Sequence, residues 1–188
     1  IAWLIKRIVA FEHANPDVDV LIDSSMRVVD LDRENVDVAI RYGVTPTGGL
    51  NIHRLFDDEI IAVCSPSLAK GPPSIETLAD LENASLIHLG MDPGSPVTTN
   101  LFDWQSWFET IGAGHLKPIR MLSFNDYNLA IQAAIAGHGM VLGSWPVVKD
   151  AIEAGLLVSP LKESAKFDIG YDLVTTKAAA AKSEVAAF

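Results

Sequence analysis

Five histidines are the side chains of this chain best suited to metal binding or acid–base chemistry. They are His13, His53, His88, His115 and His138. No two of them are four residues apart, and none lies in a cluster with the single cysteine, so the spacing of a metal site is missing. We therefore expect no metal site and no cofactor. His88, at the end of a predicted strand, is either a hydrogen-bonded structural residue or a pH-sensitive contact to a ligand, and both interpretations stay open.

The serine and carboxylate side chains do not form a hydrolytic set. Ser144 lies in Leu-Gly-Ser-Trp-Pro, which lacks the second glycine of a nucleophile elbow. Residues 57–59 (Asp-Asp-Glu) are adjacent on a predicted strand, where successive side chains point to opposite faces and cannot pair as general acid and base. The glycines of residues 137–143 close a predicted helix and lead into a strand, the reverse of a dinucleotide-binding motif. We therefore expect a protein that is not an enzyme.

Polar and aromatic side chains instead follow the predicted strands. In open α/β sheets, ligands bind beyond the carboxyl ends of strands, often against helix N-termini. The strand ends offer Arg41, Tyr42, Leu89, Gly90, Met91, Asn125, Asp126 and Tyr127. Arg41 could pair with an anionic group such as a carboxylate, and Asn125 with its helix N–H groups could receive a second polar group. Asn125 and Asp126 could equally serve as helix caps, and the two roles can coexist.

Strands and helices alternate along the chain, which is typical of an α/β fold with a mostly parallel, wound sheet. The predicted strands are residues 18–22, 36–40, 60–64, 85–89, 119–124, 140–144, 156–159 and 169–176. The predicted helices are residues 1–14, 74–81, 101–111, 126–136, 147–154 and a last one from 177, with a loop over 91–99. Residues 60–64 (Ile-Ile-Ala-Val-Cys) are apolar throughout, as in a strand covered on both faces. Such a strand can carry the chain from one lobe into a second, with a cleft between them.

Composition and charge limit the classes of partner. The 188 residues are 49% hydrophobic and carry a net charge of −10, without a cluster of lysine or arginine. An acidic surface repels phosphate backbones, so we expect no nucleic-acid binding by this chain itself. Cys64 is the only cysteine, which suits a reducing compartment such as the cytoplasm. No apolar run approaches the roughly 20 residues of a membrane span, and we expect no membrane partner.

Several segments, in order and over nearly all of the chain, resemble the effector-binding domain of LysR-type transcriptional regulators. They are residues 11–20 (Phe-Glu-His-Ala-Asn-Pro-Asp-Val-Asp-Val), 30–31 (Asp-Leu), 36–43 (Val-Asp-Val-Ala-Ile-Arg-Tyr-Gly), 54–66 and 133–142. The resemblance implies a two-lobed fold of the type 2 periplasmic-binding-protein kind. Lobe I would comprise residues 1–64 and 168–188, and lobe II residues 65–167. Each lobe would be a wound sheet with flanking helices.

The same resemblance implies a function. A small effector, anionic or amino-acid-like, would bind between the lobes, and Ser65 and Tyr171 on the crossing strands join the expected contacts. The domain would form a homodimer or homotetramer, with the first helix meeting a second subunit. DNA would be bound only by an N-terminal helix-turn-helix domain outside this chain. The strand that precedes the first helix in the family is also outside it, together with part of the effector pocket.

A periplasmic solute-binding protein of a transport system is the alternative, because it shares the two-lobed fold. Oligomeric state would discriminate the two, since transport receptors are usually monomers and a regulator domain should form a head-to-tail dimer. Neither hypothesis requires bond-making chemistry.

Overall fold

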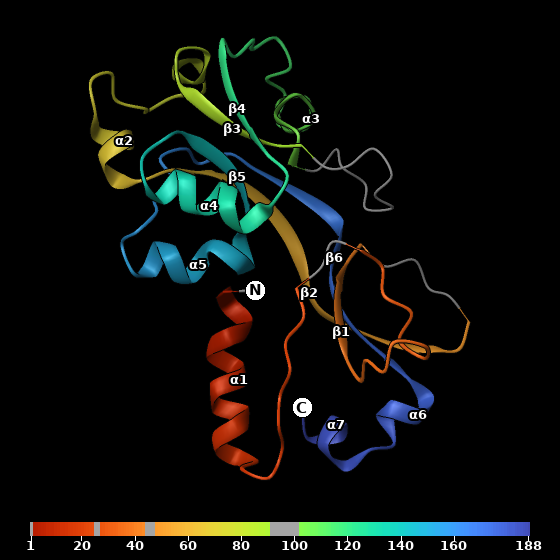
Figure 1. Cartoon of the computed structure of the whole chain (residues 1–188). Coiled ribbons are helices and arrows are strands. Elements are labelled where there is room, and N and C mark those ends of the chain that lie inside the picture. The colour runs from red at the N-terminus through yellow and green to blue at the C-terminus, as the bar shows by residue number, and fades with distance from the viewer. Residues whose placement is uncertain (1, 25–26, 44–47, 91–101) are drawn as a thin grey trace. The chain divides into compact units, whose positions relative to one another are not determined.

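The computed structural model describes residues 2–24, 27–43, 48–90 and 102–188 (Figure 1). The chain divides into two compact units. Unit 1 comprises Ile1–Asp58 and Phe167–Phe188, and unit 2 comprises Glu59–Lys166. Two long strands, β2 (Leu50–Val63) and β6 (Ser164–Thr176), each pass from one unit into the other. The assignment of the two units as effector-binding lobes stays a prediction.

The described strands form a six-stranded sheet in the order β1-β6-β2-β5-β3-β4. In unit 1, β1 (Ala39–Tyr42) pairs antiparallel with β6, so that Arg41 lies opposite Asp172 and Tyr42 opposite Tyr171. Helix α1 (Ala2–Ala14) packs on this unit through edge-to-face ring contacts of Trp3 with Phe56 and of Phe11 with Phe188. The short helices α6 (Lys177–Ala180) and α7 (Ser183–Ala187) follow β6.

The sequence pattern predicts a mostly parallel sheet, whereas the described pairings are mixed, and the parallel ones lie in unit 2. Strand β3 (Ser85–Leu89) pairs in parallel with β4 (Arg120–Phe124) and with β5 (Met140–Ser144), and β5 pairs antiparallel with β2. Helices α4 (Tyr127–Ile135) and α5 (Trp145–Glu153) lie together along this sheet (Figure 1). Their apolar residues form one core with alternate strand residues: Ile61, Val63, Ile87, Ala130, Ala133, Ala134, Val141, Val148 and Leu157.

Helix α3 (Trp104–Thr110) supplies the other large buried side chains of unit 2. Trp104, Trp107 and Phe108 are almost fully buried and contact one another. The indole N–H of Trp104 donates to the carbonyl of Ile87 at 2.9 Å, and that of Trp107 donates to the carbonyl of Ile60 at 3.1 Å. Both tryptophans are therefore core residues.

Three predicted elements differ from the structure. Residues 18–22 are not a strand, because no described strand pairs with them, and Leu21 is 96% exposed. Residues 156–159 make only one isolated bridge, between Val158 and Cys64. The predicted helix over 74–81 is replaced by a short 3₁₀ helix, Leu78–Glu82, because the Asp80 carboxylate accepts the N–H groups of Glu76 and Thr77 and holds a turn there.

Other boundaries shift without a change of element type. The strand expected at 36–40 is β1 at 39–42, and the last strand begins at 164 instead of 169. The strands at 85–89 and 140–144 are confirmed. Helix α2 (Pro66–Lys70) was not predicted. The loop expected over 91–99 lies outside the described residues. Among the described helices, none is long and apolar enough to cross a bilayer.

Candidate ligand site

The carboxyl ends of β3, β4 and β5 meet at one edge of the sheet in unit 2. Parallel pairing places Leu89 beside Phe124, and the Gly90 N–H donates to the Phe124 carbonyl at 2.8 Å. Leu89 is buried, whereas Gly90 is half-buried and Asn125 is exposed. The structure therefore brings the predicted residues Leu89, Gly90 and Asn125 to one edge, where open α/β sheets bind ligands. Met91 lies outside the described residues.

The start of helix α4 completes this edge. Asp126 is the N-cap of α4, and its carboxylate accepts the N–H of Leu129 at 2.8 Å. The Tyr127 hydroxyl accepts the N–H of Ser144, at the end of β5, at 2.9 Å, and its ring contacts Phe102. Asp126 thus has the capping role that the sequence allowed, and Tyr127 ties the helix to the neighbouring strand.

His88 points toward the N-terminus of α3. Its Nδ1 lies 3.9 Å from Oδ1 of Asp103, too far for a hydrogen bond, and within the described part of the chain this buried nitrogen has no hydrogen-bond partner. The other oxygen of Asp103 caps α3 by accepting the N–H of Ser106 at 2.9 Å. His88 is thus a partly buried polar side chain at the edge where the candidate site lies.

Ser65 lies at another place in unit 2. It is buried and is the N-cap of α2, where its hydroxyl accepts the N–H of Leu68 at 3.2 Å and lies 3.0 Å from the Ser67 hydroxyl. These hydrogen bonds give Ser65 a structural role, which is to cap α2. Its predicted contact with an effector stays a prediction.

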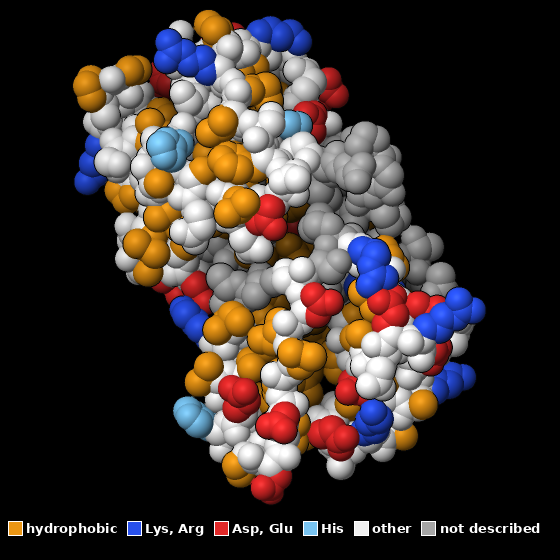
Figure 2. All heavy atoms as spheres, in the orientation of Figure 1, with side chains coloured by type: hydrophobic (Ala, Val, Ile, Leu, Met, Phe, Trp, Pro, Cys, Tyr) orange, Lys and Arg blue, Asp and Glu red, His pale blue; other side chains and the backbone are white. Residues whose placement is uncertain are grey.

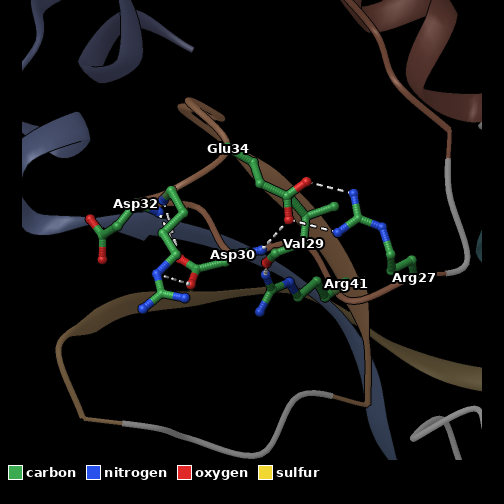
Figure 3. A network of polar contacts seen from close by, with 7 residues as sticks. Arg27, Val29, Asp30, Asp32, Glu34 and Arg41 are labelled. Carbon is green, nitrogen blue, oxygen red and sulfur yellow. Dashed lines mark hydrogen bonds and ion pairs between the residues drawn. The ribbon is translucent and has the colours of Figure 1, made fainter.

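Arg41 belongs to unit 1 and holds a turn in place (Figure 3). Its guanidinium donates to the carbonyl of Val29 at 2.5 Å. Within the same turn, Arg27 makes a bidentate pair with Glu34 at 2.6 and 2.5 Å, and Glu34 also accepts the N–H of Asp30. Arg41 therefore has a structural partner in this structure, and the anion contact expected for it stays a prediction.

Tyr42 and Tyr171 are brought together as opposite residues of β1 and β6. Their ring centroids are 4.8 Å apart, and Phe56 continues the aromatic row at 5.1 Å from Tyr171. Trp3 extends it from α1, again at 5.1 Å. The two tyrosines are thus part of the packing of unit 1, on the opposite side of the sheet from their strand neighbours Arg41 and Asp172.

The sequence analysis missed an ion pair in unit 1 between a buried carboxylate and a more exposed arginine. Asp172 is 2% exposed, and one of its oxygens accepts from Nε of Arg54 at 2.6 Å. Arg54 also contacts Asp57 at 2.6 Å, and these two carboxylates, Asp172 first, raise the pKa of the guanidinium. The available signal was Asp172 itself, the one charged residue of the predicted strand 169–176, because a buried charge requires a partner.

A cavity of about 150 Å³ opens in unit 1 between the turn at residues 31–37 and the segment after β6. Lys182 and Asp37 form an ion pair of 2.6 Å at its wall, which raises the pKa of the lysine. None of the predicted site residues lines it. No group of three or more His, Cys, Asp or Glu side chains in the described residues could hold a metal ion.

The chain has an α/β fold of the type 2 periplasmic-binding-protein kind, as predicted. Two solved structures share it over nearly the whole chain. The effector domain of the transcriptional regulator AmpR of Pseudomonas aeruginosa matches with a TM-score of 0.74 and 22% identity, covering 99% of this chain and 84% of that one. The regulatory domain of CrgA of Neisseria meningitidis matches with a TM-score of 0.69 and 20% identity, covering 98% and 88%.

The chain belongs to the LysR substrate binding domain family, whose family model matches residues 1–188. It is 31% identical over 188 residues to the glycine cleavage system transcriptional activator of Escherichia coli (strain K12), covering 100% of this chain and 59% of that relative. It is 28% identical over 158 residues to the HTH-type transcriptional regulator DsdC of the same strain, covering 84% and 50%. The chain thus spans three fifths or less of these relatives.

The family confirms the expectation that this domain is not an enzyme, since its matched relatives are named as transcriptional regulators. The same comparisons do not favour the alternative of a periplasmic solute-binding protein.

Proposed function

We propose that this chain is the effector-sensing and oligomerisation domain of a bacterial LysR-type transcription regulator. The match of the family model to residues 1–188 carries this proposal. The regulator would bind DNA through an N-terminal helix-turn-helix domain outside this chain, since the domain itself has a net charge of −10. It would work in the cytoplasm, where the DNA is.

The effector would contact the carboxyl edge of the sheet in unit 2, at Gly90, Asn125 and the start of α4. The exposed amide of Asn125 can donate and accept hydrogen bonds, and the N-terminus of α4 favours negative charge. These groups suit a small anion or an amino-acid-like molecule. Effector binding would act by a population shift, because a ligand that prefers one conformation of the domain increases its share.

A second copy of the chain would cover the apolar sheet edge at β4 in unit 2, whose side chains lie on both faces of the strand. Strand β4 is at the end of the strand order, and large apolar side chains are exposed on it, just before it and on the neighbouring helix α4. They are Ile119 (77% exposed), Met121 (51%), Leu122 (46%) and Leu129 (56%). Figure 2 shows hydrophobic side chains at the surface of unit 2 where Figure 1 draws α4 and α5. An uncovered apolar edge strand invites aggregation, which a specific homodimer would prevent.

The experiment that tests the proposed function is DNA footprinting of the full-length protein on its own upstream region, with and without effectors found by thermal-shift screening of this domain. A regulator would give a footprint whose extent or affinity changes with effector, whereas the domain alone would give none. A full-length protein that binds no DNA would contradict the proposal.

A further inference from the structure

The buried carboxylate of Asp172 lies between two arginines on one face of the sheet in unit 1. Strand β6 has β1 on one side and β2 on the other. Asp172 is directly opposite Arg41 of β1, and directly opposite residues of an antiparallel pair project from the same face. From β2, Arg54 donates to Oδ1 of Asp172 at 2.6 Å.

Only one oxygen of this carboxylate is satisfied. Asp172 is 2% exposed, and its Oδ2 is buried without a hydrogen-bond partner among the described residues. A buried carboxylate oxygen without a donor is costly, and such groups are rare in folded proteins. The arginine directly opposite Asp172 on β1, Arg41, is engaged elsewhere: its guanidinium donates to the Val29 carbonyl at 2.5 Å (Figure 3).

We propose that Arg41 is a two-position latch, which exchanges the Val29 carbonyl for Oδ2 of Asp172. In the position seen here, Arg41 fastens the turn of residues 27–34 to β1 and leaves Asp172 half-satisfied. In the other position it completes the hydrogen bonds of Asp172 and releases the turn at Val29. Opposite residues of a strand pair have Cβ atoms about 5 Å apart, which is within the reach of an arginine side chain.

The rest of the turn suits such a switch, because its other contacts do not use Arg41. The bidentate Arg27–Glu34 pair, and the Asp30 carboxylate that accepts the N–H groups of Asp32 and Arg33, close the turn on itself. Loss of the Val29 contact would therefore detach the turn from β1 without unfolding it. The latch does not depend on the proposed effector, and it gives unit 1 two states that a ligand could bias.

Hydrogen exchange of the full chain, followed for residues 27–34 in three variants, tests the latch. Asp172→Asn removes the negative charge that competes for Arg41, so Arg41 should bond the Val29 carbonyl for more of the time. Protection of the turn should then increase about fivefold, which corresponds to about one hydrogen bond. Arg54→Gln removes the other hydrogen-bond partner of Asp172, so the Asp172 carboxylate should attract Arg41 more strongly. Protection of the turn should then fall by a similar factor. Arg41→Ala should give the lowest protection of all.

The critical result is that Asp172→Asn should raise the protection of the turn, whereas Arg54→Gln should lower it. Both variants break the Arg54–Asp172 pair, so a merely structural role for that pair would lower protection in both. Lys70→Gln, an equal change of charge to that in Arg54→Gln but in unit 2, is the matched control and should leave the turn unchanged. Equal loss of protection in Asp172→Asn and Arg54→Gln, or no change in either, would overturn the latch.

Discussion

Cys64 shows how burial fixes the chemistry of one residue. Its side chain is fully buried at the end of β2, and its backbone N–H and C=O are both bonded to Val158. Burial raises the pKa of the thiol to about 11 from an ordinary value of 9.0. The thiolate fraction at pH 8 is then about 100-fold lower than for a free cysteine, before steric protection is counted.

We therefore predict that Cys64 resists alkylation in the native domain. Iodoacetamide labelling followed by mass spectrometry should be at least about 100-fold slower than in the same protein unfolded in denaturant. Rapid labelling of the folded protein would show that the end of β2 is not packed as described.

The carboxyl group of Glu34 has a strongly lowered pKa. The hydrogen bond from Arg27, and next the N–H of Asp30, lower the pKa of its carboxyl to about 2 from 4.5. Because the folded-state pKa is depressed, the stabilisation by this carboxylate is fully present above about pH 4.5, its ordinary pKa, and is lost as the pH falls toward 2.

An NMR titration of the Glu34 carboxyl should therefore give a midpoint near 2 in the wild-type chain. Arg27→Gln should raise that midpoint toward the ordinary value. Arg33→Gln is the control, because Arg33 pairs with Asp30 and not with Glu34, and it should leave the midpoint low. An ordinary midpoint in the wild-type protein would contradict the network of Figure 3.

At the scale of elements, strands β2 and β6 approach closely at Gly170. A Cβ atom there would lie 2.0 Å from the Phe56 carbonyl oxygen and 2.9 Å from the Asp57 Cα, both backbone atoms that cannot move aside cheaply. Gly170→Ala should lower the free energy of unfolding by about 2–3 kcal/mol. Gly48→Ala is the matched control, since nothing lies within 4 Å of its Cβ position.

Guanidinium denaturation followed by circular dichroism measures both variants. Equal midpoints for Gly170→Ala and the wild-type chain would mean that the two strands are farther apart at this point than described.

The sequence predicted best the strands whose partner strands lie in the same unit. Residues 85–89 and 140–144 are apolar strands with both neighbours within unit 2, so their pattern sufficed. Residues 18–22 are also mainly apolar, but no strand of the described residues pairs with them, and pairing cannot be inferred from one segment alone. The helix over 74–81 failed because the Asp80 carboxylate favours a local turn over a regular helix.

The candidate site was likewise predictable only in part. Topology alone brought Gly90 and Asn125 to one sheet edge, since parallel strands end together. The partners of Arg41 and Asp172 were not predictable, because both depend on which residues face one another across β1, β6 and β2. Register of this kind is set by tertiary packing.

At the scale of the whole molecule, the exposed apolar surface of β4 and α4 predicts self-association. Met121→Lys puts a charge on this surface and should shift a dimer toward monomer in analytical ultracentrifugation, with a dissociation constant at least about tenfold higher. Val28→Lys, at a 53% exposed apolar position in unit 1, is the matched control and should leave association unchanged. A wild-type chain that is monomeric at high concentration would contradict the proposed dimer.

Effector binding is the central claim, and a thermal-shift titration of the purified domain with small carboxylates and amino acids tests it most directly. At least one compound should raise the melting temperature saturably, by about 5–10 °C at 100 times its dissociation constant. Asn125→Ala should weaken that compound about tenfold, whereas Asn51→Ala, at an exposed position of β2 in unit 1, should not. A folded domain that no compound stabilises, or equal binding by both variants, would contradict the account of this site.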